Sequence, residues 1–439
     1  MSRSRMGPLA VLLAAVAAAM FISALAPANA QPVLPEAASS GESALAVSGY
    51  LRWQWINARY LSFGNEGGDN HGVFLQRYHL GASWRASSQL RLMGELKSNH
   101  QRGREPRPLP VDVDRLDVHQ AYIDAGPESL PMLRLGRQEL QYGAGRRLFT
   151  RNGPNVRGNF DAAKLMLRAQ DWNIDALAFR PVAVDPGSFD DHTVDGQSFV
   201  GVYASGPFAP IAPLQLDLYV LRSHRDGARF EQGAAAERRL SFGLRTFGRA
   251  GPWDHDHEIT WQTGRSGSAG IAAWSVAGEA GHSWVEADWK PRASLRLTVG
   301  SGDRDAGDPR LQTFYSLFPR GGAVDEGFSV SAANMTQGRA ALTVKPRAAV
   351  EITLALNTQW RTSRRDGVYG PGGGLIRRAA GSDARHIGDS IDLIALWVVH
   401  RDVAFDLTAG WFRSGRYVAE SGPSRNMTFV TPSLRIRFP

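Results

Sequence analysis

The sequence predicts an all-β protein, a transmembrane antiparallel β-barrel of about 18 strands, and three observations support this prediction. First, apolar and polar residues alternate with a period of two from Ala44 to the end of the chain, and many polar positions are basic. Second, helical periodicity never continues for three turns after the N-terminal segment. Third, short and long connections alternate along the chain. Outer-membrane barrels show this asymmetry because their tight turns face the periplasm and their longer loops face outside.

The stretch from Leu133 to Leu167 illustrates the plan of the chain. Leu133 and Leu135 alternate with Arg134 in its first strand, and Lys164 alternates with apolar residues in its second. A long Gly-rich loop between the two strands contains Arg146, Arg147, Arg151 and Arg157. A strand with a basic second face needs water on that face. This stretch is therefore either an amphipathic hairpin of a soluble sheet or a barrel hairpin with lipid outside and a charged lumen inside.

The same alternation recurs along the chain. It is clearest at residues 45–55, 90–97, 295–299, 339–345, 350–361 and 433–438. It is blurred near Val200, Leu216 and Trp274, where the strand assignments are weakest. Each candidate strand has about ten residues or more, enough to cross the hydrocarbon layer when tilted. An even number of strands places both ends of the chain on the periplasmic side, and a barrel of this size leaves room for an aqueous channel unless loops fill it.

The connections between these strands fall into two classes. Short connections are expected at residues 86–88, 126–131, 170–171, 206–213, 249–254, 288–294, 345–348 and 400–402. Between them are expected long loops at 57–71, 100–114, 141–157, 183–195, 227–235, 304–333, 362–387 and 415–425, and one short connection at 265–269. A β-sandwich has no reason to keep the two classes in alternation.

The N-terminus has the pattern of a cleaved secretory signal. Arg3 and Arg5 precede an apolar run from Leu9 to Leu25, which ends before the small residues Ala28-Asn29-Ala30. We expect residues 1–30 to be a signal peptide, 31–43 a periplasmic tail and 44–438 the barrel. A retained transmembrane anchor is the alternative, but the Ala-rich run ends next to a suitable cleavage site.

Composition sets further limits. The chain contains no cysteine, so no disulfide framework or thiol chemistry is expected. Four of its 50 basic residues are lysines and the others are arginines, through coding bias or a need for fixed charges that bind carboxylates with two parallel hydrogen bonds. The last strand places Leu434, Ile436 and Phe438 at alternate positions, as in the terminal strand that barrel-assembly machinery recognises. Pro439 follows the final aromatic residue, where it disturbs no pairing.

Several segments, in conserved order over nearly the whole mature chain, resemble the alginate-export family of outer-membrane barrels. They are residues 77–82 (RYHLGA), 114–122 (DRLDVHQAY), 135–140 (LGRQEL), 153–157 (GPNVR), 301–305 (SGDRD), 313–314 (TF), 317–319 (LFP), 360–361 (WR) and 366–369 (DGVY). The resemblance implies a monomeric barrel in the bacterial outer membrane, with an arginine-rich constriction through which an anionic polyuronate leaves the periplasm. One departure is that the family's exporter carries a long periplasmic plug, whereas every periplasmic connection expected here is short.

The candidate pore-lining and substrate-binding residues are basic residues at inward positions or in the loop between the two strands described above, together with Arg137 of the family-like segment 135–140. They are Arg52, Arg91, Lys97, Arg134, Arg137, Arg151, Arg157, Lys164, Arg168, Arg296, Arg339 and Arg361. Their summed field would attract carboxylates, and many weak sites let a charged chain slide. The alternative is that they pair with lumen carboxylates and brace the wall. Candidate partners are Glu95, Asp117, Glu351 and Asp406.

Arg137 does not fit the expected pattern, because it falls on the apolar parity of its strand. Either a β-bulge turns it inward or the assumed register is wrong by one residue.

Two other motifs were weighed as metal sites. Asp303, Asp305 and Asp308 lie in a Gly-rich segment but lack the remaining positions of a calcium loop. His255 and His257 could share a strand face and bind a metal, but a polar periplasmic turn is the favoured interpretation. We expect no metal, no cofactor and no enzymatic activity, because no Ser, His and acid constellation or phosphate loop is present.

The sequence therefore predicts an outer-membrane channel that passes anionic saccharides, as polymer export or oligomer uptake. A porin for small organic anions and, less favoured, a barrel enzyme or a plugged adhesion barrel are the alternatives. Expected partners are outer-membrane lipid and lipopolysaccharide, an anionic polysaccharide or organic acid, and the barrel-assembly machinery, with no nucleic acid. Any gate is expected from the outer loops, particularly residues 100–114 and 304–333.

Overall fold

The computed structural model describes residues 45–64, 70–104, 109, 111–127, 131–208, 211, 214–320 and 330–438. The predicted signal peptide (1–30), the predicted tail (31–43), the expected first barrel residue Ala44, and Pro439 lie outside the described residues. No helix in the described ranges is long and apolar enough to cross a membrane.

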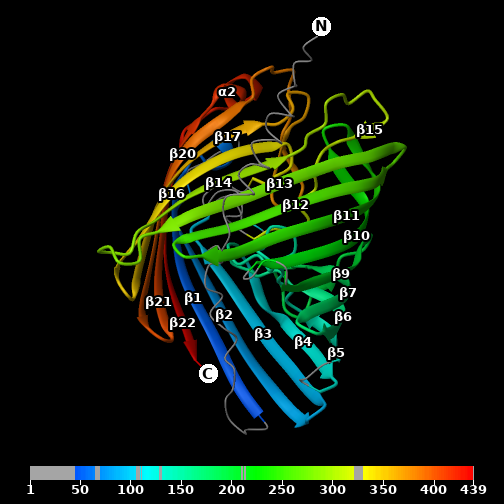
Figure 1. Ribbon diagram of the computed structural model, residues 1–439, viewed down its shortest axis with the longest axis vertical. Coiled ribbons are helices and arrows are strands. Elements are labelled where there is room, and N and C mark those ends of the chain that lie inside the picture. Colours follow the sequence, from blue (N-terminus) through cyan, green and yellow to red (C-terminus); the bar gives the residue numbers. More distant parts are fainter. Residues whose placement is uncertain are drawn as a thin grey trace.

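Within the described residues, eighteen strands form one closed antiparallel barrel, which confirms the predicted fold class (Figure 1). The barrel strands are β1 (Leu45–Arg59), β2 (Asn70–Ser87), β3 (Leu90–Arg102), β4 (Asp114–Ala125), β5 (Met132–Gln138), β6 (Phe160–Ala169), β7 (Trp172–Ala183), β9 (Gln197–Pro207), β10 (Gln215–Phe230), β11 (Gly233–Ala250), β12 (Trp253–Ser266), β13 (Ala269–Ser283), β14 (Arg292–Gly300), β16 (Met335–Arg347), β17 (Val350–Arg361), β20 (His386–His400), β21 (Val403–Ser414) and β22 (Met427–Phe438). The smaller elements are η1 (Leu61–Gly64), β8 (His192–Thr193), β15 (Arg310–Leu311), β18 (Val368–Tyr369), β19 (Leu375–Arg377) and α2 (Arg416–Ser421).

The last strand closes the barrel against the first. β22 pairs antiparallel with β1, for example Leu51 with Ile436, and Figure 1 shows the red β22 beside the blue β1. Closure leaves no unpaired sheet edge in the hydrocarbon layer, where an unsatisfied backbone group would be costly.

The two ends of the barrel differ as the sequence predicts. Short connections at 88–89, 126–131, 170–171, 208–214, 251–252, 284–291, 348–349 and 401–402 share the end that carries the C-terminus. The opposite end carries the long loops and α2. The loop predicted at 227–235 is wrong, because only residues 231–232 connect β10 and β11. Its small residues continue the ladder, where Ala228 pairs with Ala235.

In the barrel wall apolar side chains point outward and polar side chains point inward, which is the reverse of a soluble β-sheet protein. Outward leucines such as Leu80 and Leu295 are 55% and 69% exposed, whereas the inward side chains of Arg77 and Lys97 are fully buried at 0%. This is the pattern of a strand that meets lipid on one side and a polar interior on the other.

Loops occupy much of the interior. Leu148 of the loop 139–159 forms a parallel bridge with Phe318 of the loop 301–334, and the Phe149 amide donates to the Phe318 carbonyl at 2.9 Å. Both loops pack against inward apolar residues of the wall, among them Phe179, Phe199 and Tyr219.

This packing explains the blurred alternation near Val200, Leu216 and Trp274. Phe199, Leu221 and Ile271 lie in these three strands, point inward and are buried in the apolar clusters formed with the loops. Apolar residues therefore occur at inward as well as outward positions of these strands, beside polar inward residues such as Asp217 and Glu279, which weakens the period-two signal.

β5 is unusually short. It has 7 residues, fewer than any other barrel strand among the described residues. The loop 184–196 reaches from β7 to β4, where Ser188 bridges to Leu116 and the Phe189 amide donates to the Leu116 carbonyl at 2.9 Å. This loop thus passes β5 and β6 at the long-loop end of the wall.

Candidate functional site

The loop at residues 139–159, here called the inner loop, lies inside the barrel against β1 to β4. Its Asn155 is fully buried, and the amide nitrogen of this side chain contacts the carbonyl oxygens of Gln76, His100 and Asp112 at 3.0, 3.0 and 2.9 Å. These contacts fix the loop to the wall and to the neighbouring loop 103–113.

Two arginines of adjacent strands hold the same loop. Arg52 Nη1 donates to the Asn152 carbonyl at 2.7 Å, and Arg77 donates from Nε to the Asn155 carbonyl at 2.7 Å and from Nη2 to the Pro154 carbonyl at 2.5 Å. Arg52 and Arg77 face each other in the register of β1 and β2. The fork of each guanidinium group lets it bind several carbonyls of one loop.

All the acceptors of these hydrogen bonds are neutral. Arg77 also donates to the side-chain oxygen of Asn152 at 2.5 Å, again an amide. A guanidinium group remains protonated under all ordinary conditions. The positive charges of Arg52 and Arg77 therefore hold the loop without being neutralised through these bonds.

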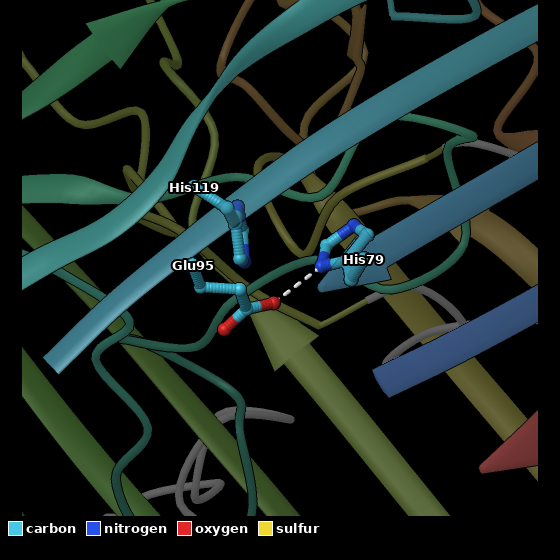
Figure 2. Close-up of side chains that lie close together, drawn as sticks. All are labelled: His79, Glu95 and His119. Carbon is cyan, nitrogen blue, oxygen red and sulfur yellow. Dashed lines mark hydrogen bonds and ion pairs between the residues drawn. The ribbon is translucent and has the colours of Figure 1, made fainter. Parts of the chain in front are cut away.

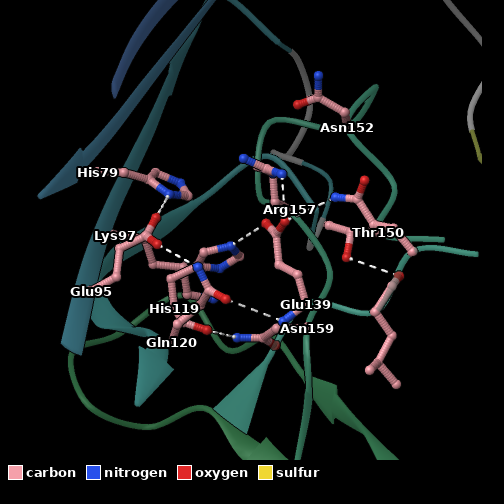
Figure 3. Close-up of polar contacts among 12 residues, drawn as sticks. His79, Glu95, Lys97, His119, Gln120, Glu139, Thr150, Asn152, Arg157 and Asn159 are labelled. Carbon is pink, nitrogen blue, oxygen red and sulfur yellow. Dashed lines mark hydrogen bonds and ion pairs between the residues drawn. The ribbon is translucent and has the colours of Figure 1, made fainter. Parts of the chain in front are cut away.

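A chain of bonded polar groups extends from the inner loop to β4. Arg157 Nη2 donates to Glu139 Oε2 at 2.7 Å, and the other oxygen of Glu139 lies 2.7 Å from His119 Nε2 (Figure 3). Burial raises the pKa of Glu139, but Arg157 and His119 outweigh this effect and hold the pKa below its usual value. Glu139 is therefore a carboxylate in the working pH range.

Further cations lie near Tyr50 on β1. The guanidinium groups of Arg52, Arg77, Arg157 and Arg435 all lie within electrostatic range of the Tyr50 hydroxyl. Arg435 forms a bidentate pair with Asp406 at 2.5 and 2.6 Å. This side of the interior thus gathers guanidinium groups from β1, β2, β22 and the inner loop.

The opposite side of the interior, formed by β10 to β14, contains arginines paired with carboxylates. Arg245 binds Asp217 at 2.6 Å and Asp256 at 2.7 Å, and Glu237 is shared by Arg225 and Arg239 at 2.7 and 2.8 Å. The inner loop also reaches this network, where Arg146 binds Asp256 and Glu258 at 2.7 and 3.2 Å.

Six of the twelve predicted site residues form ion pairs. The pairs are Lys97 with Asp114 and Asp191, Arg134 with Asp124, Arg137 with Asp161, Arg157 with Glu139, Lys164 with Asp175, and Arg296 with Glu279. Of the four carboxylates proposed as partners, Asp406 pairs with Arg435 and Glu351 with Lys345, whereas Glu95 contacts His79 and Asp117 lies 3.7 Å from Arg137.

The other six residues lie in varied surroundings. Arg52 and Arg361 bind carbonyl oxygens, and those of Arg361 belong to loop residues that include Ser382 at 2.7 Å. Arg168 is exposed near a short turn and contacts Asn173. Arg91 and Arg151 are half-buried, and the buried Arg339 faces Arg296 across β16 and β14. The structure thus brings Arg52 and Arg157 together near Tyr50 and leaves Arg168 and Arg361 apart from them.

Both explanations offered for Arg137 are wrong. Leu133 and Leu135 are exposed as predicted, so the register is correct, and β5 pairs without a shift with β4 and β6. Arg137 keeps its outward parity, and its charge is met by Asp161, whose Oδ1 lies 2.9 Å from Arg137 Nε.

The sequence reasoning missed Arg77 as a site residue, although it lies in one of the family-like segments. Its inward neighbours Val73 and Leu75 are apolar and buried under the loops. Because these neighbours are apolar, the alternation in β2 did not reveal that Arg77 points inward. A test of parity from both neighbouring strands would have found it, because Arg52 is its partner in the register.

The two motifs weighed as metal sites are not assembled as such. Asp303 is 1% exposed and accepts from the Gln312 amide at 3.3 Å, whereas Asp305 and Asp308 are on the surface and accept from nearby backbone amides. Burial raises the pKa of Asp303 to about 6. His255 and His257 lie in β12 rather than in a turn, with ring centroids 5.2 Å apart, and among the described residues no third imidazole or carboxylate lies close enough to complete a metal site with them.

The sequence matches the family model described as alginate export over residues 44–431. The chain belongs to the alginate export family. No curated protein matches the sequence. Solved structures with the same fold include Acinetobacter baumannii OccAB3, with a TM-score of 0.64 and 9% identity over 90% of this chain and 99% of that one.

Two Pseudomonas aeruginosa structures are similar in the same way. OccK8 (OprE) has a TM-score of 0.58 and 10% identity over 90% of this chain and 98% of that one. OpdK has a TM-score of 0.59 and 13% identity over 90% and 99%. At such low identity these structures show the fold alone. Family and fold together identify an alginate export family channel of the bacterial outer membrane.

Proposed function

We propose that this channel passes anionic saccharides, and that their carboxylates travel along the side of the interior formed by β1, β2, β22 and the inner loop. The observation that supports this proposal is the bonding of Arg52 and Arg77. Both guanidinium groups are inside the barrel and donate to neutral oxygens of the inner loop. Their charge therefore remains available to attract an anion.

The neighbouring groups favour passage over tight capture. Arg157 and Arg435 are close to the same place, and each is partly balanced by a carboxylate, Glu139 or Asp406. A carboxylated solute would meet several cations of moderate strength in succession. Multiple weak sites let a charged chain move on, whereas one strong site would retain it.

A second candidate function is the passage of small organic acids. The longest connection at the short-turn end of the described structure is 284–291, so no long plug emerges from that end within the described residues. Loops inside the barrel narrow the interior, which suits small solutes. The similar OpdK structure was solved with vanillate, a small aromatic carboxylate.

Conductance in planar lipid bilayers tests the proposal. We expect a reversal potential that indicates anion selectivity under a KCl gradient, and partial block of the current by an added polyuronate. Block by vanillate but not by the polymer would select the small-acid function. Cation selectivity, or no conductance from a folded barrel, would overturn both.

The surroundings proposed for the channel follow from its outer face. The exposed leucines and tryptophans of the strands contact outer-membrane lipid, and the alternating apolar residues of β22 suit recognition by the barrel-assembly machinery.

A further inference from the structure

His79, Glu95 and His119 come together inside the barrel from three consecutive strands, β2, β3 and β4. Figure 2 shows the three side chains converging on one point beside the wall. A register shift explains how His119 reaches it. Glu95 pairs with Gln120 and Leu96 pairs with Val118, which leaves His119 as an extra residue of β4. Such a bulge re-aims a side chain, here toward the interior.

The contacts among these residues leave ring nitrogens unused. His79 Nδ1 lies 2.5 Å from Glu95 Oε1, and the two imidazole rings are 4.6 Å apart. Both histidine side chains are buried, at 2% and 0% exposure. Among the described residues, neither His79 Nε2 nor His119 Nδ1 has a hydrogen-bond partner. A buried polar atom without a partner is costly, which suggests that something else is bound there.

We propose that His79, Glu95 and His119 form a binding site for a divalent transition metal, of which zinc fits best. Two imidazoles and one carboxylate are a donor set that zinc accepts, with a fourth position left open. One ligand atom from each residue lies within 4.8 Å of the other two. Tetrahedral zinc needs its ligand atoms about 3.3 Å apart, so these side chains would close around the metal on binding.

Glu139 supplies the supporting contact that such sites use. Its carboxylate lies 2.7 Å from His119 Nε2 and leaves Nδ1 of the same ring unpartnered. A carboxylate on the far nitrogen fixes the ring and its tautomer and makes the other nitrogen a better ligand. Gln120 likewise donates to Glu95 Oε2 at 2.6 Å and orients the third ligand.

A second cluster of three potential metal ligands differs from the histidine cluster, because a lysine is bound to it. Asp114, Asp117 and Asp191 also lie close together, but the ammonium group of Lys97 is 2.7 Å from Asp114 and 2.5 Å from Asp191. That cluster already holds a cation. In the histidine cluster Glu95 is bonded to His79 and Gln120, and Arg157 binds Glu139 instead, so no arginine or lysine of the described residues bonds to Glu95.

The site would connect the wall to the inner loop. Glu139 is the first residue of that loop, so a metal held by His119 would stabilise the point from which the loop departs. Access is from the side of Glu95, which retains 14% side-chain exposure. This inference does not depend on what the channel transports.

Metal binding by the purified, folded barrel in detergent tests the proposal. After EDTA treatment and desalting, we expect zinc chloride to bind at one equivalent per chain by isothermal titration, and cobalt to give the visible absorption of a tetrahedral site. Glu95→Gln and His119→Ala should each lower the zinc affinity at least about tenfold, since ligand loss removes a metal bond. The double variant His255→Ala/His257→Ala, which removes two histidines outside the cluster, should bind as the wild type does.

Folding is monitored separately, by the heat-dependent shift of barrel mobility on gels. Glu95→Gln preserves the shape of the side chain, so it still tests the site if the His119→Ala variant does not fold. A folded wild-type barrel that binds no zinc or cobalt would overturn the proposal. So would binding that survives in folded Glu95→Gln and His119→Ala but is lost in the His255/His257 control.

Discussion

The two sides of the barrel interior use arginine in different ways. On the side of β1 and β2, Arg52 and Arg77 donate to neutral carbonyls of the inner loop. On the side of β10 to β13, Arg245 and Arg239 bind carboxylates. In the first arrangement the arginines fix a loop and keep their positive charge. In the second the arginines fix the wall, and their charge is cancelled by the carboxylates. The number of arginines in a lumen therefore does not determine its electric field, because the groups that bind each arginine decide how much of its charge is cancelled.

The carboxylates show the reverse case. Asp366 is buried and accepts from the Asp303 amide, the Thr313 hydroxyl and the Tyr369 hydroxyl, at 2.8, 2.6 and 2.6 Å. These donors are neutral, and burial raises the pKa of Asp366. The loops thus contain buried acids with neutral partners, as the wall contains buried arginines with neutral partners.

The largest effect is expected from Arg245→Ala. The substitution removes the cation that binds the buried carboxylates of Asp217 and Asp256. Breaking a buried ion pair costs about 3–5 kcal/mol of folding stability. Urea unfolding in lipid vesicles should show this loss as a lower unfolding midpoint. Arg168→Ala, at an exposed residue, is the matched control and should leave the midpoint unchanged. An unchanged midpoint in Arg245→Ala would show that these ion pairs do not brace the wall.

The next effect is expected from Arg52→Ala/Arg77→Ala. Each lost hydrogen bond from a charged group contributes about 1.5–3 kcal/mol, so the inner loop should detach from the wall. Single-channel conductance should rise several-fold and anion selectivity should fall. Arg77→Lys keeps the charge but not the fork, so it should loosen the loop and retain most of the selectivity. If the conductance and the anion selectivity of the double variant equal those of the wild type, the inner loop does not line the conduction path.

The smallest effect concerns Asp303. Its folded-state pKa is about 6, above its ordinary value of 3.8, so the folded loop binds this proton more tightly than the unfolded chain does. The stability that protonation provides is lost as the pH rises toward and through 6. Between pH 5 and 7.5 the loss is about 1–2 kcal/mol. Proteolysis of the loop 301–320 should be faster at pH 7.5, and Asp303→Asn should weaken this dependence. Equal rates at both pH values in the wild type would contradict the expectation.

The sequence predicted the architecture well for a physical reason. A strand between lipid and a polar interior must alternate, and β1 and β3 show this directly in their sequences. The prediction weakened where loops supply an apolar surface inside, as at Phe199 and Ile271. There the inward face no longer differs from the outward one.

The candidate site was harder to predict. Period-two parity tells which way Arg52 points, but not whether a carboxylate or a carbonyl will meet it. The expected gating loops were 100–114 and 304–333, and the described part of the second does lie inside the barrel with the inner loop. The inner loop's own position depends on Asn155 and on contacts across 55 to 79 residues, which no local pattern reveals. His119 was missed because its bulge breaks parity.

The shortness of β5 has a consequence for the surrounding bilayer. Seven residues tilted at about 45° rise only about 16 Å, less than the apolar band of about 25 Å that such barrels present. Outer-leaflet lipids beside this strand would face a lowered rim and the 61% exposed ring of Phe189. The membrane is therefore expected to thin locally on this flank, which would give the molecule a preferred side toward its neighbours in the plane of the membrane.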